Sequence, residues 1–595
     1  MMSAFRQNSY LFGGNAPFVE ELYESYLQNP ASVDEAWRTY FDNLQSLPAS
    51  DGSTETRDVA HAPIVQSFVE RARSGALQPQ QMGGNIETAR KQVHVAQLIA
   101  AYRWLGSRHA DLDPLKRLDR PDIPELSPSF YGFTEGDHAH IYSAANTFFG
   151  LDNAPLRDIL QALRETYCST IGAEFMHMSD PAAKRWIQER LETARGRFGF
   201  DADTKKRILE RLTAAEGLER YLHTRYVGQK RFSLEGGESF IAAMDTLVRE
   251  GGKHGLQEMV IGSAHRGRLN LLVNVLGKMP KDLFAEFEGK HASDLPSGDV
   301  KYHQGFSSDV STPGGPMHLS LAFNPSHLEI VSPVVEGSTK ARQVRRGDRN
   351  GSDVLSVLVH GDAAFAGQGV VMETLNLTET RGYGTRGTVH LVINNQIGFT
   401  TSDTRDSRST LYCTDVVKSI EAPVFHVNGD DPEAVVFVTQ LALDYRMKFR
   451  KDVVVDIVCF RKLGHNEQDT PSVTQPLMYK RINVHPGTRK LYAERLEAQG
   501  TIGKDYADQL VTAYRDAMDA GKHTVDPVIT SHKSRFSSDW TQFLNKKWTD
   551  AADTGLPVAE LKRLGEKITQ VPEGFKLHPL VQKVVADRRA MALGE

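Results

Sequence analysis

The sequence predicts an α/β fold built on a doubly wound parallel sheet, and two observations lead to this prediction. The first is a series of five short apolar runs, rich in valine and isoleucine, in which apolar and polar residues do not alternate. The runs span residues 256–264, 354–362, 387–395, 422–429 and 452–460. Such runs are typical of strands covered on both faces of a sheet. The second is the helical segments between the runs, because regular alternation of strands and helices favours a parallel sheet.

The clearest of these helices is expected over Pro432–Arg450. Asp431 precedes it as an N-cap, and Pro432 occupies the first helical position, where a missing N–H is tolerated. The α/β region as a whole is expected to span residues 246–480. A polar helical extension is expected over residues 481–595.

Three segments are expected before the α/β region. Residues 1–45 should hold two short helices, residues 46–62 are small and polar and predict a flexible linker, and residues 63–245 should be mainly helical. The first short helix is indicated by Phe18, Leu22, Tyr23 and Tyr26, and the second by Val33–Leu44 with Ser32 as its N-cap. Because a predicted linker separates these two helices from the rest of the chain, residues 1–45 are expected to form a docking arm.

Composition excludes several classes of protein. The chain has 595 residues, of which 40% are hydrophobic and 24% charged, as in ordinary globular proteins. A formal charge of −5 gives no reason to expect nucleic acid as a partner. There is no apolar run near the roughly 20 residues that cross a bilayer, so no membrane partner is expected. The N-terminus shows no signal or transit peptide, which predicts a cytoplasmic bacterial protein.

The three cysteines support this localisation. Cys168, Cys413 and Cys459 are far apart and form no CxxC pair. This pattern indicates a reducing compartment and argues against a zinc or iron–sulfur site.

A candidate metal site is indicated at two predicted strand ends. Asp362 follows the second run and Asn395 follows the third, 33 residues later (395 − 362). Ligands bind at such carboxyl ends of parallel strands. Mg²⁺ prefers oxygen ligands, so Asp362, Asn395 and the Ile397 carbonyl are expected to hold it. The small residues Ala363 and Ala364 would let phosphates approach the backbone. Alternatively, Asp362 caps a helix and Asn395 belongs to a turn.

Two other phosphate-binding patterns are absent from the sequence. The GQG spacing at 367–369 is followed by Met372 where a dinucleotide fingerprint requires glycine, and there is no GxxxxGK[ST] loop.

A GDA step followed by NN resembles the thiamine diphosphate signature, and further motifs make the resemblance specific. These are AHRGRLN, GDVKYHQGF, FNPSHLEIVSPVVEG, HGDAAFAGQG, VINNQIGFTT, DDPEAV and GHNEQDTPSVTQPLMY, in this order. Over essentially its whole length the chain resembles the first, decarboxylating components of 2-oxoglutarate dehydrogenase complexes. Chains of that family are much longer, so we expect the pyrimidine-binding lobe, with the glutamate that activates thiamine, to be missing here and residues 1–595 alone to be inactive.

The resemblance implies a transketolase-like thiamine diphosphate-binding fold, with thiamine diphosphate and Mg²⁺ as cofactors. It implies oxidative decarboxylation of 2-oxoglutarate in the tricarboxylic acid cycle, with transfer of the succinyl group to a lipoyl-lysine of the dihydrolipoyl succinyltransferase core. Dihydrolipoyl dehydrogenase would be a partner in the same complex, the docking arm would bind other components, and the enzyme would be a homodimer.

The resemblance also implies roles for single residues. His265 and His303 would be catalytic and bind the substrate carboxylates and the oxyanion, and His465 would be an active-site loop residue that binds substrate. Arg266 would contact cofactor or substrate. Ser326, Leu328, Asp362, Ala363, Ala364, Asn395 and Ile397 would contact the cofactor. Cationic and donor groups suit a substrate with two carboxylates.

Other interpretations remain open at this point. The chain could be an inactive fragment or a regulatory paralogue that binds cofactor or partners without turnover. Pyruvate and branched-chain decarboxylases are disfavoured because the histidine-rich motifs suit a dicarboxylic substrate. Any one histidine of the 21 could simply be a surface or buried structural residue. Arg268 is expected to make a structural ion pair.

Overall fold

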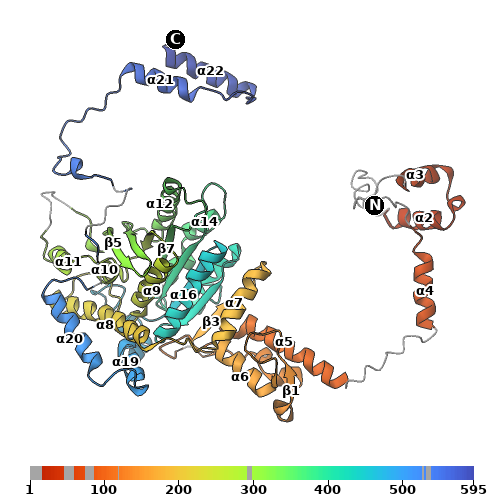
Figure 1. Cartoon of the computed structure of the whole chain (residues 1–595), viewed down its shortest axis with the longest axis horizontal. Coiled ribbons are helices and arrows are strands. Elements are labelled where there is room, and N and C mark those ends of the chain that lie inside the picture. Colours follow the sequence, from red (N-terminus) through yellow and green to blue (C-terminus); the bar gives the residue numbers. More distant parts are fainter. Residues whose placement is uncertain are drawn as a thin grey trace. The chain divides into compact units, whose positions relative to one another are not determined.

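A computed structural model describes most of the chain. The described residues are 16–45, 59–73, 86–117, 119–290, 298–524, 528–530, 536 and 538–594. The chain divides into two compact units, Met1–Ile529 and Thr530–Glu595. The larger unit contains a sheet flanked by helices (Figure 1).

This sheet has eight strands in the order β3-β9-β10-β8-β7-β4-β6-β5. The strands are β3 (Ile171–Glu174), β4 (Glu258–Ser263), β5 (Phe306–Thr312), β6 (Gly315–Leu321), β7 (Val354–Gly361), β8 (Thr388–Asn394), β9 (Val424–Asn428) and β10 (Val453–Val458). The six strands from β9 to β6 are parallel, whereas the edge strands β3 and β5 are antiparallel to their neighbours. A separate hairpin joins β1 (Ile141–Ser143) to β2 (Asn153–Pro155).

Helices cover both faces of the sheet, and the side chains of each strand alternate between them. On β10, Val453, Val455 and Ile457 belong to a large apolar cluster that includes residues of α9 (Ser239–Lys253) and α16 (Pro432–Phe449). Val454 points to the opposite cluster, together with residues of α13 and α14. Burial of both faces explains why the strands are continuously apolar in sequence.

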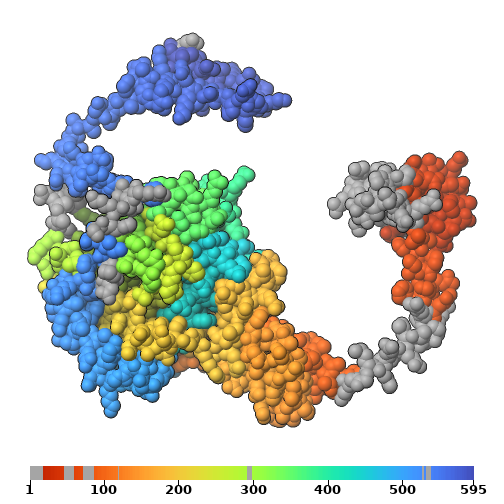
Figure 2. All heavy atoms as spheres, in the orientation of Figure 1, coloured from red at the N-terminus to blue at the C-terminus, as the bar shows by residue number. Residues whose placement is uncertain are grey.

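The other helices between residues 86 and 529 lie before, between and after these strands. They are α5 (Ile86–His109), α6 (Leu156–Tyr167), α7 (Pro181–Ala194), α8 (Ala202–Arg225), α10 (Arg268–Asn274), α11 (Pro280–Phe287), α12 (Val331–Arg346), α13 (Asp362–Gly367), α14 (Gly369–Leu377), α15 (Thr404–Ser407), α17 (Pro471–Thr474), α18 (Pro476–Ile482), α19 (Thr488–Ala498) and α20 (Tyr506–Asp519). Short 3₁₀ turns occur at Pro124–Leu126, Pro128–Tyr131, Glu135–Ala139, Lys301–His303 and Cys413–Ile420. Both α19 and α20 contact α8, although more than 260 residues separate each of them from α8 in sequence. The space-filling view shows the yellow and blue segments side by side (Figure 2).

The five predicted strands are confirmed. The helix predicted after Asp431 is confirmed as well, and the Asp431 side chain caps it by accepting from Ala434 N–H. Three strands of the eight-stranded sheet, β3, β5 and β6, were not predicted, and neither was the hairpin of β1 and β2. β3 has four residues, and β5 is largely polar because it lies at the edge of the sheet. The signal for β5 and β6 was the turn sequence Pro313–Gly314 between two segments of strand length.

The predicted domain boundaries stay predictions, but two observations bear on them. β3 lies within the segment 63–245 that was expected to be helical, yet it pairs with β9 in the main sheet. The compact units divide at residue 529, which lies inside the predicted extension 481–595. The stretch 46–58 of the predicted linker is outside the described residues.

The N-terminal segment contains the two expected helices, α2 (Ala16–Gln28) and α3 (Glu35–Gln45), and then α4 (Ala62–Arg73). The predicted cap was wrong: Ser32 ends a 3₁₀ turn, and Asp34 accepts from Trp37 N–H instead. Tyr23, Tyr26 and Phe41 form a small aromatic core between α2 and α3.

The unit Thr530–Glu595 contains the turn Thr541–Phe543 and two helices that contact each other, α21 (Val558–Ile568) and α22 (Pro579–Leu593). Among all described residues, no helix has both the length and the apolar character needed to cross a membrane.

Candidate active site

Three neighbouring strands end at the same edge of the sheet. β4 is followed by His265 and Arg266, β7 by Asp362 and β8 by Asn395. β7 lies between β4 and β8 and is parallel to both. The predicted site residues from three segments are therefore gathered where ligands bind in open parallel sheets.

Asp362 and Asn395 are in contact. Oδ1 of Asp362 accepts from the backbone N–H of Asn395 at 3.2 Å and from its Nδ2 at 3.4 Å. Asp362 is only 4% exposed. Burial raises the pKa of the Asp362 carboxyl to about 6, and the nearby Asp456 contributes in the same direction. A buried carboxylate in this state favours a cation as its partner.

The residues around Asp362 fit Mg²⁺. The expected donors are one carboxylate, the amide oxygen of Asn395 and the backbone carbonyl of Ile397, and hard oxygen ligands suit this ion. Oδ1 of Asn395 accepts from Arg266 here, so ligation would require the amide to leave that contact. No group of three or more His, Cys, Asp or Glu side chains among the described residues could hold a metal, and the expected site contains only one such residue. We call Asp362, Asn395 and Ile397 the carboxylate edge.

The loop after Asn395 is tightly fixed. Gln396 and Phe399 have positive φ angles of 57° and 51°. The Nε2 group of Gln396 donates to Asp113 and to the Cys459 carbonyl. Ile397 is buried against residues that include Phe460. A Cβ atom on Gly398 would lie 2.6 Å from Cβ of Ala363, so the loop packs closely on the start of α13.

The Arg266 guanidinium is occupied by the protein itself. It donates to the carbonyls of Ser233, Leu234, Glu235 and Phe460 and to Oδ1 of Asn395. Arg266 thus links the end of β4 to the end of β8. A direct contact with cofactor or substrate stays a prediction for this residue.

His265 and His303 face each other. Their Nε2 atoms are 3.0 Å apart, and Nδ1 of His303 is 2.9 Å from Oδ1 of Asp299. Burial, together with the nearby His303 and Arg268, lowers the pKa of His265 to about 4. His265 is therefore neutral near pH 7.

Aromatic rings surround this pair. The Phe232 ring centre lies 5.0 Å from that of His265, 4.8 Å from Tyr302 and 5.4 Å from His465. Burial lowers the pKa of His465 as well, and Arg461 contributes in the same direction. We call His265, His303, His465, Phe232 and Tyr302 the histidine cluster. It combines residues from four connections of the chain.

The loop with Ser326 and Leu328 lies beside the histidine cluster. Ser326 Oγ is 3.4 Å from Nε2 of His303. Glu329, which ends this loop, is buried and contacts Nδ1 of His360 at 2.6 Å, so the loop is anchored to β7. Leu328 is half-buried, and Ala363 and Ala364 form the first turn of α13 next to Asp362. Their contacts with cofactor stay predictions.

The sequence interpretation missed two members of the cluster and misassigned one arginine. Tyr302 precedes His303 in the quoted KYH motif, which was the available signal. Phe232 lies in no recognised motif. Arg268 makes no ion pair with a described residue: it is fully buried and donates to the carbonyls of Gln304, Ala322 and Ser263.

These features define an α/β protein with a candidate ligand site at the carboxyl edge of a parallel sheet, where the buried Asp362 and His265, the partner of His303, follow neighbouring strands. Comparison with known proteins makes the class specific. Residues 210–526 match the family described as dehydrogenase E1 component, and residues 8–47 match the family described as 2-oxoglutarate dehydrogenase N-terminus. The chain belongs to the dehydrogenase E1 component family, whose members depend on thiamine diphosphate.

Several curated relatives are named 2-oxoglutarate dehydrogenase E1 component. The chain is 68% identical to that of Cupriavidus necator over 595 residues, which is 100% of this chain and 62% of the relative. It is 51% identical to that of Azotobacter vinelandii (100% and 63%) and 46% identical to that of Haemophilus influenzae (98% and 62%). The chain thus spans slightly less than two thirds of the length of these relatives.

Proposed function

We propose that this chain is the part of a 2-oxoglutarate dehydrogenase that binds the diphosphate of the cofactor and recognises the substrate. The reaction is the Mg²⁺- and thiamine diphosphate-dependent decarboxylation of 2-oxoglutarate. The succinyl group passes to a lipoyl-lysine of dihydrolipoyl succinyltransferase, as in the tricarboxylic acid cycle. The carrying observation is that the His265–His303 pair lies at the same sheet edge as Asp362 and Asn395. The 68% identity to a protein of that name supports it.

The carboxylate edge would hold the metal through Asp362, Asn395 and the Ile397 carbonyl, and the metal would neutralise the diphosphate charge. When bound, thiamine diphosphate supplies an electron sink for the bond pair left by departing carbon dioxide. The chain itself supplies binding and orientation. Burial of Asp362 favours occupation by a cation, because burial disfavours the ionised carboxylate and a bound cation would compensate its charge.

The histidine cluster would bind the dicarboxylate. In neutral His303, Nδ1–H donates to Asp299, so Nε2 accepts from Nε2–H of His265. A substrate carboxylate that enters next to the pair can receive the His265 hydrogen bond. Through its contact with His265, His303 would orient the His265 ring for the substrate.

The test uses the full natural chain with thiamine diphosphate, Mg²⁺ and an artificial electron acceptor. We expect carbon dioxide release from 2-oxoglutarate with a kcat/KM at least about a hundredfold above that for pyruvate, because pyruvate lacks the second carboxylate that the histidine cluster would bind. Equal rates for both substrates, or cofactor binding without turnover, would contradict the proposal. The second outcome would support a regulatory protein.

Residues 1–45 would form a docking arm for the other components of the complex. These components are the dihydrolipoyl succinyltransferase core and dihydrolipoyl dehydrogenase. The enzyme itself would be a cytoplasmic homodimer. The match of residues 8–47 to a 2-oxoglutarate dehydrogenase N-terminus supports the arm, as does the aromatic core that α2 and α3 share. Deletion of residues 1–45 should leave decarboxylation with the artificial acceptor intact and impair assembly with the succinyltransferase, measured by analytical ultracentrifugation. Loss of both would place the arm in the catalytic fold.

A further inference from the structure

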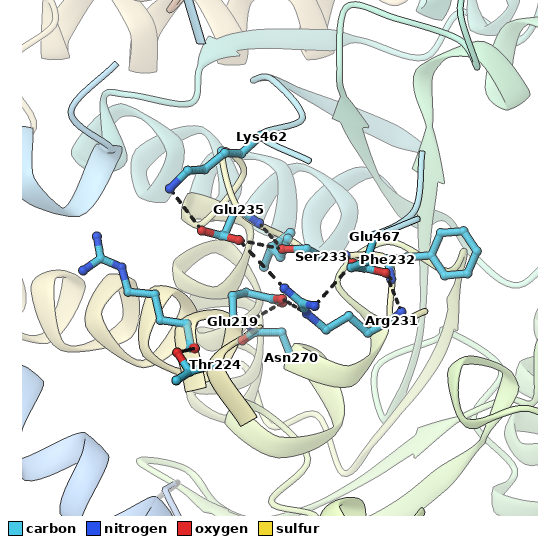
Figure 3. Close-up of polar contacts among 12 residues, drawn as sticks. Glu219, Thr224, Arg231, Phe232, Ser233, Glu235, Asn270, Lys462 and Glu467 are labelled. Atoms are coloured by element: carbon cyan, nitrogen blue, oxygen red, sulfur yellow. Dashed lines mark hydrogen bonds and ion pairs between the residues drawn. The ribbon is translucent and has the colours of Figure 1, made fainter. Parts of the chain in front are cut away.

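Phe232 and His465 lie on two loops that are remote in sequence, and the carboxylate of Glu467 connects the two loops close to both residues. Oε2 of Glu467 accepts from the backbone N–H groups of Arg231 at 2.7 Å and Phe232 at 3.2 Å, and Oε1 accepts from that of Ser233 at 2.9 Å. The Glu467 side chain is 3% exposed. Figure 3 shows Glu467 beside this turn, with the Phe232 ring pointing away from the charged groups.

The backbone at this turn requires such a partner. Phe232 has a φ of 55°, in the left-handed region that bulky residues rarely adopt. Successive N–H groups that converge because one residue is left-handed form a concave anion site. The Glu467 carboxylate fills this site with its two oxygens. It therefore stabilises the conformation that directs the Phe232 ring towards His265.

The Glu467 carboxylate lies in a buried group of charged side chains. The Arg231 side chain is 1% exposed, and its guanidinium lies 3.9 Å from Glu467, 3.3 Å from Glu219 and 4.0 Å from Glu235. Lys462 donates to Glu235 at 3.2 Å from the same loop that carries Glu467. The loop of residues 462–467 is thus joined to the turn of residues 231–235 by ionic contacts at both ends.

Glu467 links the position of the Phe232 ring to that of His465, because it is close to both residues along the chain or through hydrogen bonds. Glu467 is two residues after His465, and it binds the residues on both sides of the Phe232 backbone. The Phe232 ring lies between His265 and His465, at 5.0 Å and 5.4 Å from their ring centres. A shift of either loop would change the spacing of all three rings.

We propose that Glu467 is a positioning residue for substrate recognition: it holds the Arg231–Ser233 turn against the His465 loop, so that the Phe232 ring is fixed between His265 and His465. This inference rests on the proposed function, because it assigns the histidine cluster to substrate binding. It concerns recognition and not cofactor binding, since Glu467 makes no contact with the carboxylate edge that the structure records.

The test variant is Glu467→Gln in the full natural chain. Glutamine offers one acceptor oxygen and would direct an NH₂ group at a backbone N–H. Misplacement by about 1 Å can cost about a hundredfold in rate. We expect kcat/KM for 2-oxoglutarate to fall about tenfold to a hundredfold, mainly through KM, while thiamine diphosphate affinity changes less than twofold. Glu494→Gln, at an exposed helical glutamate, is the matched control and should change neither.

A double-mutant cycle separates positioning from general weakening. If Glu467 acts through the Phe232 ring, Glu467→Gln should add less than twofold to the loss caused by Phe232→Ala. Full additivity, an unchanged KM or an equal loss of cofactor affinity would overturn the inference. If Glu467→Gln fails to fold, Glu467→Asp replaces it as the test variant. This variant keeps the charge beside Arg231 and should raise KM by less than the factor expected for Glu467→Gln. Failure of both variants to fold would show a purely structural role and overturn the inference. An unmodified chain without activity on 2-oxoglutarate would instead refute the proposed function.

Discussion

The two halves of the candidate site are held in place by different means. At the carboxylate edge, Asp362 and Asn395 directly follow β7 and β8, which are adjacent parallel strands. In the histidine cluster only His265 follows a strand closely, while His303, Phe232 and His465 come from connections. The sheet therefore fixes the first half, whereas contacts between loops, such as those of Glu467, fix the second. Substitutions in one half should leave the other largely unchanged.

The largest effect is expected at the carboxylate edge. Asp362→Ala removes its only carboxylate, and a lost metal contact is worth several kcal/mol, so Mg²⁺-dependent thiamine diphosphate affinity should fall about a thousandfold. Titration calorimetry on the full natural chain measures this. Glu379→Gln, at an exposed glutamate, is the control. Unchanged affinity in Asp362→Ala would show that the metal ligands are assigned to the wrong residues.

A smaller effect with the opposite selectivity is expected in the histidine cluster. His265→Ala or His303→Ala should lower kcat/KM for 2-oxoglutarate about a hundredfold, because His265 would donate to the substrate carboxylate and His303 would orient the His265 ring. Thiamine diphosphate affinity should stay within about twofold. Steady-state kinetics and calorimetry test the two halves separately.

The surface residue His254, which pairs with Asp444, provides the control variant His254→Ala. If His265→Ala weakened cofactor binding as strongly as Asp362→Ala does, the division of the site into two independent halves would be wrong.

The difference between the strand-fixed carboxylate edge and the loop-fixed histidine cluster explains which site residues could be predicted from the sequence. Asp362 and Asn395 were recognisable because each directly follows an apolar strand, and the order of such strands places their ends together. Phe232 was not recognisable, because its place in the cluster depends on a left-handed turn stabilised by a residue 235 positions later (467 − 232). Arg268 was misassigned because nothing local reveals that its partners are backbone carbonyls on other segments. The roles taken from family resemblance stay predictions.

A third prediction concerns the close approach of the loop at Gly398 to Ala363 at the carboxylate edge. In Gly398→Ala the new methyl group would meet Cβ of Ala363 at 2.6 Å, so the loop with the Ile397 carbonyl must move away from Asp362. Cofactor affinity should fall about tenfold, with kcat/KM at saturating cofactor little changed. Gly382→Ala, where a methyl group has open space, is the matched control. Equal effects of both substitutions would mean that this close approach is unimportant.

The smallest effect concerns the buried charges beneath the carboxylate edge. His426 lies between Asp456 and Glu174, at 2.7 Å and 3.1 Å, with the Tyr412 ring stacked on it and Lys418 bound to Glu174. Burial alone would lower the pKa of His426, but the hydrogen bonds with Asp456 and Glu174 outweigh burial and raise it to about 9. Asp456 in turn accepts from Asn394, the residue before Asn395.

The sign of the pH dependence follows from that shift. The ordinary pKa of histidine is about 6.5, so folding tightens proton binding at His426. Its contribution to the free energy of unfolding is complete below pH 6.5 and is lost as the pH rises through 9. The melting temperature of the parent should therefore exceed that of His426→Gln by several degrees at pH 6 and by less at pH 9.5. A constant difference across this pH range would mean that His426 is neutral in the folded protein.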